Sequence, residues 1–293
     1  MIKQALAFSA LLTACSAAVA QAQTAADGPA AQLFHVGAFE VTALRDKVNT
    51  FPNDGKVFGA EVGTQAVADV LAAAGAPTDS ITLGVDALLV KDAGKRILID
   101  TGLGPNVQGL LIPSLAKAGY SPAQITDVLI THVHGDHIGG LVTAGGTQAF
   151  PQAVVKISAP DWTWLQGQAD MANLVKVIAP QVKTFAPGDE VAPGIRSVPL
   201  KGHTPGHVGY QLTSGKAQLL DVGDLAHSSI LSLAKPDWSI TFDNDRDEGV
   251  ATRRKELAKL AADHETIFAP HFPFPGVGKI VAEGDHFVWQ PAK

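Results

Sequence analysis

The stretch THVHGDHIGG, residues 131–140, places four side chains that can bind metal within six positions: His132, His134, Asp136 and His137. On an extended segment, residues two apart point to the same side, so His132 and His134 can reach one ion together. Gly135 lets the chain turn after them, so Asp136 and His137 can reach a second ion nearby. Because the stretch holds three of the ten histidines in the chain, it predicts a metal site rather than a polar loop.

The composition is that of a globular protein. The chain has 293 residues, of which 46% are apolar, enough for a packed core. It carries 22 basic and 28 acidic residues, a net charge of -6. The densest basic cluster, Arg253-Arg254-Lys255, has acidic neighbours, so nothing in the chain would neutralise a run of phosphates. We therefore expect no nucleic-acid partner.

Residues 1–22 have the pattern of an export signal, with one early positive charge at Lys3, an apolar run and small residues beyond. The apolar run is too short for a membrane span. Cleavage after Ala18-Val19-Ala20 would release a periplasmic or secreted protein, whereas Leu12-Thr13-Ala14-Cys15 resembles a bacterial lipobox and would leave a lipid anchor on Cys15. Cys15 is the only cysteine, so the first route leaves no thiol for disulfides or for zinc.

The remainder, residues 23–293, alternates strand-like and helix-like runs without a Pro/Gly/Ser linker, which indicates one α/β domain. We expect strands over residues 33–44, 81–90, 95–99, 127–130, 153–157, 194–200, 208–212, 217–220 and 266–269. We expect helices over residues 159–179 and 248–264, and helix starts near Pro113 and at Ser121-Pro122. Candidate ligands follow several strand ends, where loops can converge on one site.

Four motifs together resemble the metallo-β-lactamase superfamily, in the same order along the chain: His132-Val-His-Gly-Asp-His137, Gly202-His-Thr-Pro-Gly-His207, Gly223-Asp224 and a late histidine, His271, after a strand. The resemblance covers essentially the whole chain after the signal, including Asp100-Thr101-Gly102. It implies an αβ/βα four-layer sandwich, with two internal sheets flanked by helices and the site at one edge. It also implies two metal ions per chain, usually zinc, although other divalent metals suit the same donors.

The resemblance assigns the ligands residue by residue. It puts His132, His134 and His203 on the first metal, and Asp136, His137 and His271 on the second. Asp224 would bridge both metals, because it carries the Gly-Asp signature. Asp221 is the rival for the bridge, but it lies within a predicted strand, where a structural hydrogen bond is the alternative role.

The bridging carboxylate also favours one branch of the superfamily, because metallo-β-lactamases lack it. The tail from His271 to Lys279, with Glu283 beyond it, is similar to the methyl parathion hydrolase branch, whose relatives include lactone and aryl-ester hydrolases. The resemblance implies a small-molecule lactone, aryl ester or organophosphate triester as substrate, and a homodimer as the assembly. The alternatives are a β-lactam-hydrolysing enzyme and a non-catalytic periplasmic zinc-binding protein.

Two cations about 3.5–4 Å apart would hold a bridging hydroxide, because metal binding lowers the pKa of water towards about 7. This hydroxide would attack an acyl carbon or a phosphorus, so no serine nucleophile is needed. Asp136 and Asp224 are the predicted catalytic residues. Besides binding metal, Asp136 would orient the hydroxide and pass a proton to the leaving group.

Five further residues are weaker candidates. His207 and His227 flank ligand motifs and would hydrogen-bond the ligand residues. The side chains of Trp162 and Trp164 either line an apolar substrate pocket or pack in the core, and the sequence leaves both readings open. Phe272 is expected to line the same pocket. His35, His264 and His286 are expected to be ordinary surface or core residues.

Overall fold

The computed structural model describes residues 28–292. The predicted export signal over residues 1–22, with Cys15, lies outside the described residues. No helix within residues 28–292 is both long enough and apolar enough to cross a membrane.

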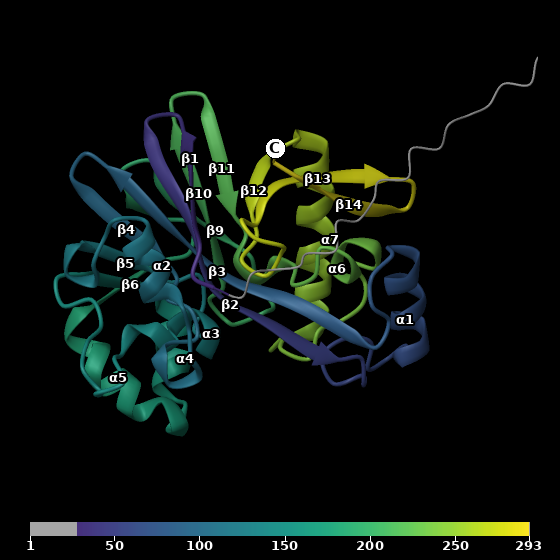
Figure 1. Cartoon of the computed structure of the whole chain (residues 1–293), viewed down its shortest axis with the longest axis horizontal. Coiled ribbons are helices and arrows are strands. Elements are labelled where there is room, and N and C mark those ends of the chain that lie inside the picture. Colours follow the sequence, from purple (N-terminus) through teal and green to yellow (C-terminus); the bar gives the residue numbers. More distant parts are fainter. Residues whose placement is uncertain (1–27, 293) are drawn as a thin grey trace, which may run out of the picture.

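Two seven-stranded sheets pack face to face in the middle of the molecule, and helices cover their outer faces (Figure 1). The first sheet contains, in spatial order, β1 (Ala31–Val36), β2 (Phe39–Pro52), β3 (Ser80–Asp92), β4 (Lys95–Ile99), β5 (Asp127–Leu129), β6 (Val154–Ser158) and β7 (Val182–Phe185). The second contains, in spatial order, β14 (His286–Pro291), β13 (Val277–Glu283), β12 (Thr266–Phe268), β11 (Ala217–Asp221), β10 (Val208–Ser214), β9 (Ile195–Pro199) and β8 (Glu190–Ala192). Both sheets are mixed, since β4 to β7 pair in parallel, as do β11 and β12. The predicted four-layer sandwich is confirmed.

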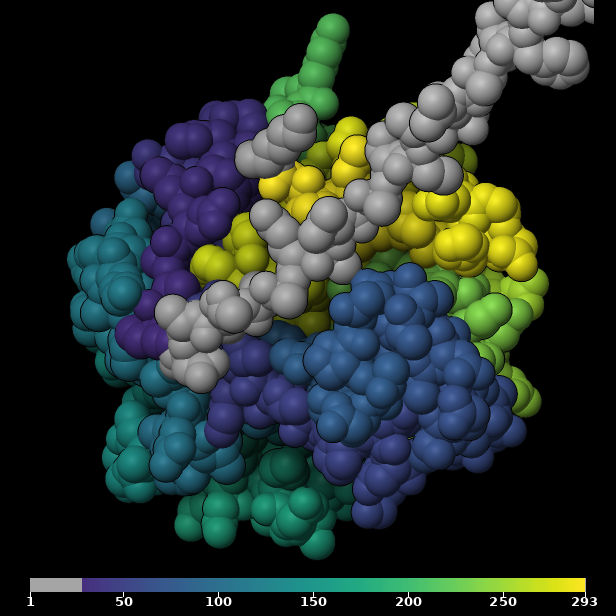
Figure 2. Space-filling model, turned by 45° about the vertical axis from the view of Figure 1, so that its right-hand side comes forward, coloured from purple at the N-terminus to yellow at the C-terminus, as the bar shows by residue number. Residues whose placement is uncertain are grey.

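The helices are α1 (Thr64–Ala73), α2 (Leu111–Lys117), α3 (Gly135–Ile138), α4 (Ala159–Gln166), α5 (Ala172–Ile178), α6 (Leu231–Ala234) and α7 (Arg246–Asp263). Single 3-10 turns lie at Pro105–Val107, Pro122–Gln124, Gly139–Leu141, Ala169–Met171, Ala179–Gln181 and Gly223–Leu225. The segment carrying α1 packs against α6 through an apolar cluster that includes Val67, Leu71 and Leu231. In the space-filling view the segment carrying α1 forms a blue surface that lies beside a green one (Figure 2).

The core follows the two-residue period of the strands. In β3, Leu88 and Val90 face the cluster between the sheets, which also contains Tyr210 and Phe268 from the second sheet. The intervening Leu89 faces the opposite cluster, under the helices that cover the first sheet. Because both faces of β3 are buried here, its residues 87–90 form a continuous apolar run.

Three predicted elements differ from the structure. The strand expected over residues 33–44 is a hairpin of β1 and β2, because Gly37 adopts a positive φ of 59° and allows a tight turn. The helix expected over residues 159–179 is divided into α4 and α5, and α4 ends at Gly167. The helix start at Ser121-Pro122 produces only one 3-10 turn, in which Gln124 Oε1 accepts a hydrogen bond from the Ser121 N–H at 2.8 Å.

Two other helix predictions are confirmed. Pro113 lies in the first turn of α2, where its missing N–H costs nothing. Helix α7 begins after Asp245, whose side chain accepts a hydrogen bond from the Glu248 N–H, and it ends at His264 in the left-handed conformation.

Candidate metal centre

The seven predicted ligand residues converge at one edge of the sandwich. They come from the loop after β5, the turn between β9 and β10, the 3-10 turn after β11 and the loop after β12. Ligand-capable atoms lie within 4.8 Å of one another in two main groups. The first group is His132, His134, His203 and Asp224, and the second is Asp136, His137 and His271. A third group, Asp224, His227 and His271, overlaps both.

Three imidazole nitrogens form a triangle in the first group. The Nδ1 atom of His134 lies 3.1 Å from His132 Nε2 and 2.9 Å from His203 Nε2. The two Nε2 atoms lie 3.2 Å apart. Zinc–nitrogen bonds of about 2.0–2.1 Å at tetrahedral angles separate the donor atoms by roughly 3.4 Å. The sides of the triangle are slightly shorter than this, so a small outward shift of the rings would accommodate one such ion.

The carboxylate of Asp224 lies between the two groups. Its Oδ2 atom is 3.1 Å from His203 Nε2 and its Oδ1 atom is 3.2 Å from His137 Nε2. His271 Nε2 lies 3.0 Å from Oδ1. Asp136 completes the second group, with one carboxylate oxygen 3.8 Å from His137 Nε2 and the other 3.8 Å from His271 Nε2. His271 Nε2 is also 3.1 Å from Oδ2, so Asp224 contacts both groups, with Oδ2 beside His203 of the first and Oδ1 beside His137 of the second.

The outer nitrogens of four histidines have acceptors that fix the ring tautomer. His137 Nδ1 lies 2.7 Å from Asp100 Oδ2, and His271 Nδ1 lies 2.7 Å from the Gly84 carbonyl. His203 Nδ1 lies 2.8 Å from Asp243 Oδ1. His132 Nδ1 lies 3.1 Å from the Thr131 hydroxyl, which itself donates to Asp100. A proton on each Nδ1 leaves the Nε2 lone pair directed into the cluster.

This arrangement fits metal cations. Lone pairs that face one another at about 3 Å repel unless a cation lies between them. Among the described residues, His137 Nε2 and Asp224 Oδ1 are buried without a hydrogen-bond partner, and buried polar atoms in native proteins are normally paired. Two divalent cations, one in each group, would separate the facing lone pairs and would provide partners for the two buried atoms. Neutral imidazoles and carboxylates are the donors that zinc accepts.

Electrostatics keep the Asp224 carboxylate ionised. Burial alone would raise the pKa of Asp224, but the surrounding histidines, His271 and His137 foremost, hold it well below its usual range. Asp221, the rival bridge, is outside both groups. It is fully buried in β11 and its Oδ1 accepts a hydrogen bond from the Gly223 N–H at 3.0 Å. Asp221 therefore stabilises the turn that presents Asp224.

The structure places both weaker histidine candidates against Asp224. His207 Nδ1 lies 2.7 Å from the Leu200 carbonyl, and His207 Nε2 accepts from the Asp224 N–H at 3.0 Å. Burial lowers the pKa of His207 to about 3, which suits a neutral ring that accepts a hydrogen bond. His227 Nε2 lies 3.0 Å from Asp224 Oδ2, and its ring stacks on His271. Burial lowers the pKa of His227 to about 4, although Asp224 acts in the opposite direction.

Asp161, in the first turn of α4, was not predicted from the sequence. Its side chain is buried and accepts hydrogen bonds from the Thr204 hydroxyl at 2.8 Å and the Gly206 N–H at 2.6 Å. It also accepts from the Val133 N–H. Burial raises the pKa of Asp161 to about 6, against the effect of these hydrogen bonds. One carboxylate thus holds the loop of His132 and His134 against the turn of His203.

The aromatic candidates separate into two kinds. The Trp164 ring is half-buried and lies edge-on to His134, with the centroids 5.9 Å apart. Trp162 is also half-buried, and both tryptophans pack against the core cluster beneath the first sheet. The expectation that Phe272 lines a pocket is corrected, because its side chain is fully buried and packs against Trp289. Phe242 was not predicted, yet it is 44% exposed and its ring lies 6.4 Å from that of His227.

A sandwich of two mixed sheets with a histidine and aspartate cluster at one edge defines a class of metal-dependent hydrolases. The chain belongs to the metallo-beta-lactamase superfamily, whose family model matches residues 81–271. That match includes all seven predicted ligands, from His132 to His271.

Several relatives are similar over much of the chain. A solved structure described as AidC, a dizinc quorum-quenching lactonase in complex with a product, is 28% identical with a TM-score of 0.86, and the match covers 91% of this chain and 99% of that one. Hydrolase AbOPH is 29% identical with a TM-score of 0.82, covering 90% and 98% of the two chains. An N-acyl homoserine lactonase of a Bacillus species is 27% identical over 155 residues, which are 45% of this chain and 59% of that protein.

Proposed function

We propose that this chain is a dinuclear zinc hydrolase that cleaves ester bonds, with lactones as its main substrates and aryl esters or organophosphate triesters as further ones. The observation that carries the proposal is the position of Asp224, whose two oxygens lie against two separate groups of histidines. A carboxylate so placed joins two cations into one centre. The similarity to a dizinc lactonase and to an N-acyl homoserine lactonase supports zinc and a lactone substrate.

The aromatic residues around the centre support a substrate with an apolar part. Trp164 lies beside His134, and Phe242 lies beside His227. Both rings are at least partly exposed. A substrate at the metals would therefore have an apolar surface available for an acyl chain or an aryl group.

The roles of the residues follow from their positions. When bound, two divalent cations supply Lewis acidity and lower the pKa of water, so that it can act as a nucleophile near neutral pH. His132, His134 and His203 would hold the first cation, and His137 and His271, with Asp136, the second. The Asp136 side chain is 30% exposed, whereas that of Asp224 is buried. Asp136 is therefore the carboxylate that can reach the substrate and transfer a proton to the leaving group.

The test is metal analysis of the purified protein, coupled to a hydrolysis panel. The panel contains γ- and δ-lactones, acyl-homoserine lactones, aryl esters, phosphotriesters and a β-lactam. We expect two zinc ions per chain and the highest kcat/KM on a lactone. Faster hydrolysis of the β-lactam than of any lactone or ester would overturn the proposed substrate class. Two bound ions without turnover of any substrate would favour a non-catalytic zinc-binding protein.

We also propose that the chain is exported, on the pattern of residues 1–22. Expression in a bacterium followed by fractionation should recover the processed protein from the periplasm or the medium. A Cys15→Ser variant separates the two routes of processing. Unchanged processing of this variant is expected, and its retention as the unprocessed precursor would indicate a lipid anchor on Cys15 instead.

A further inference from the structure

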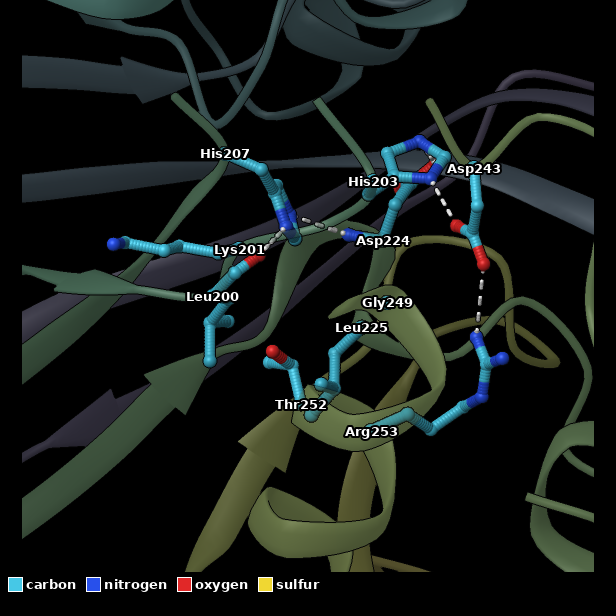
Figure 3. A pocket seen from close by; sticks show the side chains of 10 residues that line it. All are labelled: Leu200, Lys201, His203, His207, Asp224, Leu225, Asp243, Gly249, Thr252 and Arg253. Atoms are coloured by element: carbon cyan, nitrogen blue, oxygen red, sulfur yellow. Dashed lines mark hydrogen bonds and ion pairs between the residues drawn. The ribbon is translucent and has the colours of Figure 1, made fainter. Parts of the chain in front are cut away.

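One predicted ligand of the first metal is held from behind by a buried carboxylate. His203 Nδ1 lies 2.8 Å from Asp243 Oδ1, and both side chains are almost completely buried (Figure 3). Asp243 comes from the loop before α7, forty residues beyond His203. A carboxylate at this position fixes the tautomer of the ring and makes its inner nitrogen a stronger donor.

Asp243 is in turn paired with Arg253 of α7. Arg253 NH1 lies 3.5 Å from Asp243 Oδ2, and the guanidinium also donates to two backbone carbonyls, from Nε to Pro236 at 3.0 Å and from NH2 to Trp238 at 2.9 Å. Figure 3 shows the resulting chain from Arg253 through Asp243 to His203. The guanidinium is buried. A buried ion pair is costly to desolvate and is weak evidence of stability, so its position behind a ligand indicates another role.

Backbone hydrogen bonds also hold the turn that carries His203 against the start of α7. The Asn244 N–H donates to the His203 carbonyl at 3.0 Å, and the Asp245 N–H donates to the Gly202 carbonyl at 2.8 Å. A Cβ atom on Gly202 would lie 2.1 Å from the backbone nitrogen of Gly249. Only a glycine at position 202 lets the start of α7 approach this closely. The start of α7 therefore determines the position of His203.

We propose that Asp243 and Arg253 are positioning residues for the first metal, which set the orientation and donor strength of His203. The second metal has its own counterpart, since Asp100 contacts His137. Loss of the Asp243 carboxylate should therefore weaken the first ion and leave the second ion in place. The inference rests on the dinuclear centre of the proposed function.

The experiment measures both zinc dissociation constants by competition with a chelator, using the full exported chain. In an Asp243→Asn variant we expect one ion to bind about 10–100-fold more weakly, the range seen when such outer carboxylates are removed. The other ion should stay within about threefold of its original affinity. The visible absorption of the cobalt-substituted protein should change for one of the two ions. The matched control is Asp237→Asn, which removes an exposed carboxylate from the same loop.

A second variant covers the case in which the unpaired guanidinium of Asp243→Asn prevents folding. Asp243→Leu combined with Arg253→Met removes both charges, a replacement that often leaves stability unchanged. It should show the same selective loss of one ion, with the thermal midpoint of the metal-free protein close to that of the parent. Parental affinity for both ions, equal weakening of both, or failure of both variants to fold would each overturn the proposal. A parent chain that binds fewer than two ions would instead contradict the proposed function.

Discussion

The ring of His207 accepts a hydrogen bond through Nε2 from the backbone N–H of Asp224 at 3.0 Å. Its other nitrogen is occupied by the Leu200 carbonyl at 2.7 Å. Both contacts can be made at once only by the neutral ring, because a second proton would sit on the accepting nitrogen. The position of the predicted bridging carboxylate therefore depends on an uncharged histidine behind it.

This dependence predicts how stability varies with pH. Burial lowers the pKa of His207 to about 3 in the folded chain, from 6.5 in an unfolded one. Between pH 3 and pH 6.5 the unfolded state binds more protons at this position than the folded state. The stability that depends on the neutral His207 ring is therefore complete above pH 6.5 and is lost as the pH falls towards 3. Urea unfolding of the metal-free protein at several pH values should show a smaller loss of stability on acidification in His207→Gln. Between pH 3 and pH 6.5 the free energy of unfolding should fall more steeply in the parent than in His207→Gln, by up to about 1.4 kcal/mol per pH unit.

The control for this series is His35→Gln, which alters an exposed histidine on β1. It should follow the parent protein at every pH. A His207→Gln variant that loses stability on acidification as steeply as the parent would contradict the assigned tautomer.

Removal of His271 should empty one metal position. His271 Nε2 lies 3.0 Å from Asp224 Oδ1, and His271 belongs to the second group but not to the first. In His271→Ala we expect one zinc ion per chain in place of two, and a fall in lactone hydrolysis of at least about 100-fold, because one Lewis acid is lost. Elemental analysis and steady-state kinetics measure the two effects. His35→Ala should keep both ions, and two ions in His271→Ala would refute the assignment.

Asp161 should contribute to stability as well as to the first metal position. An Asp161→Ala variant leaves the Gly206 N–H and the Thr204 hydroxyl without their acceptor. Each unpaired buried donor costs about 1–3 kcal/mol, so the free energy of unfolding should fall by at least about 2 kcal/mol. Urea denaturation of the metal-free protein measures this change. Asp170→Ala, at an exposed position nearby, should change it by less than about 0.5 kcal/mol, and an equally stable Asp161→Ala would show that water replaces the carboxylate.

Phe242 should affect the choice of substrate more than the chemistry. Its ring is 44% exposed beside His227, where it can cover an apolar acyl chain. Burial of such a side chain is worth about 1.5–3 kcal/mol, so Phe242→Ala should raise KM for long-chain lactones by at least about tenfold. The kcat for a short-chain lactone should change little. Leu33→Ala, at an exposed apolar position on β1, should leave both constants unchanged, and an unchanged KM in Phe242→Ala would place the acyl chain elsewhere.

The residues that the sequence predicted as ligands lie together in the structure, and short motifs made them recognisable. His132 and His134 are two apart on an extended segment, and His203 and Asp224 lie in glycine-containing turns that are visible without any tertiary information. The same reasoning failed for Asp243 and Asp161, which reach the site only because α7 and α4 pack against its loops. Phe272 was misassigned for a related reason. Its neighbour His271 points to the centre, so Phe272, the next residue, points into the core.

The division of the ligands between the sheets has a consequence for folding. His132, His134, Asp136 and His137 follow β5 of the first sheet, whereas His203, Asp224 and His271 follow strands of the second. Each metal position would therefore take two residues from each half of the molecule, with Asp224 shared. A chain cut between β7 and β8 would give two fragments, and neither would hold a complete set for either ion. Such a centre would join the two halves, so metal uptake would report directly on their assembly.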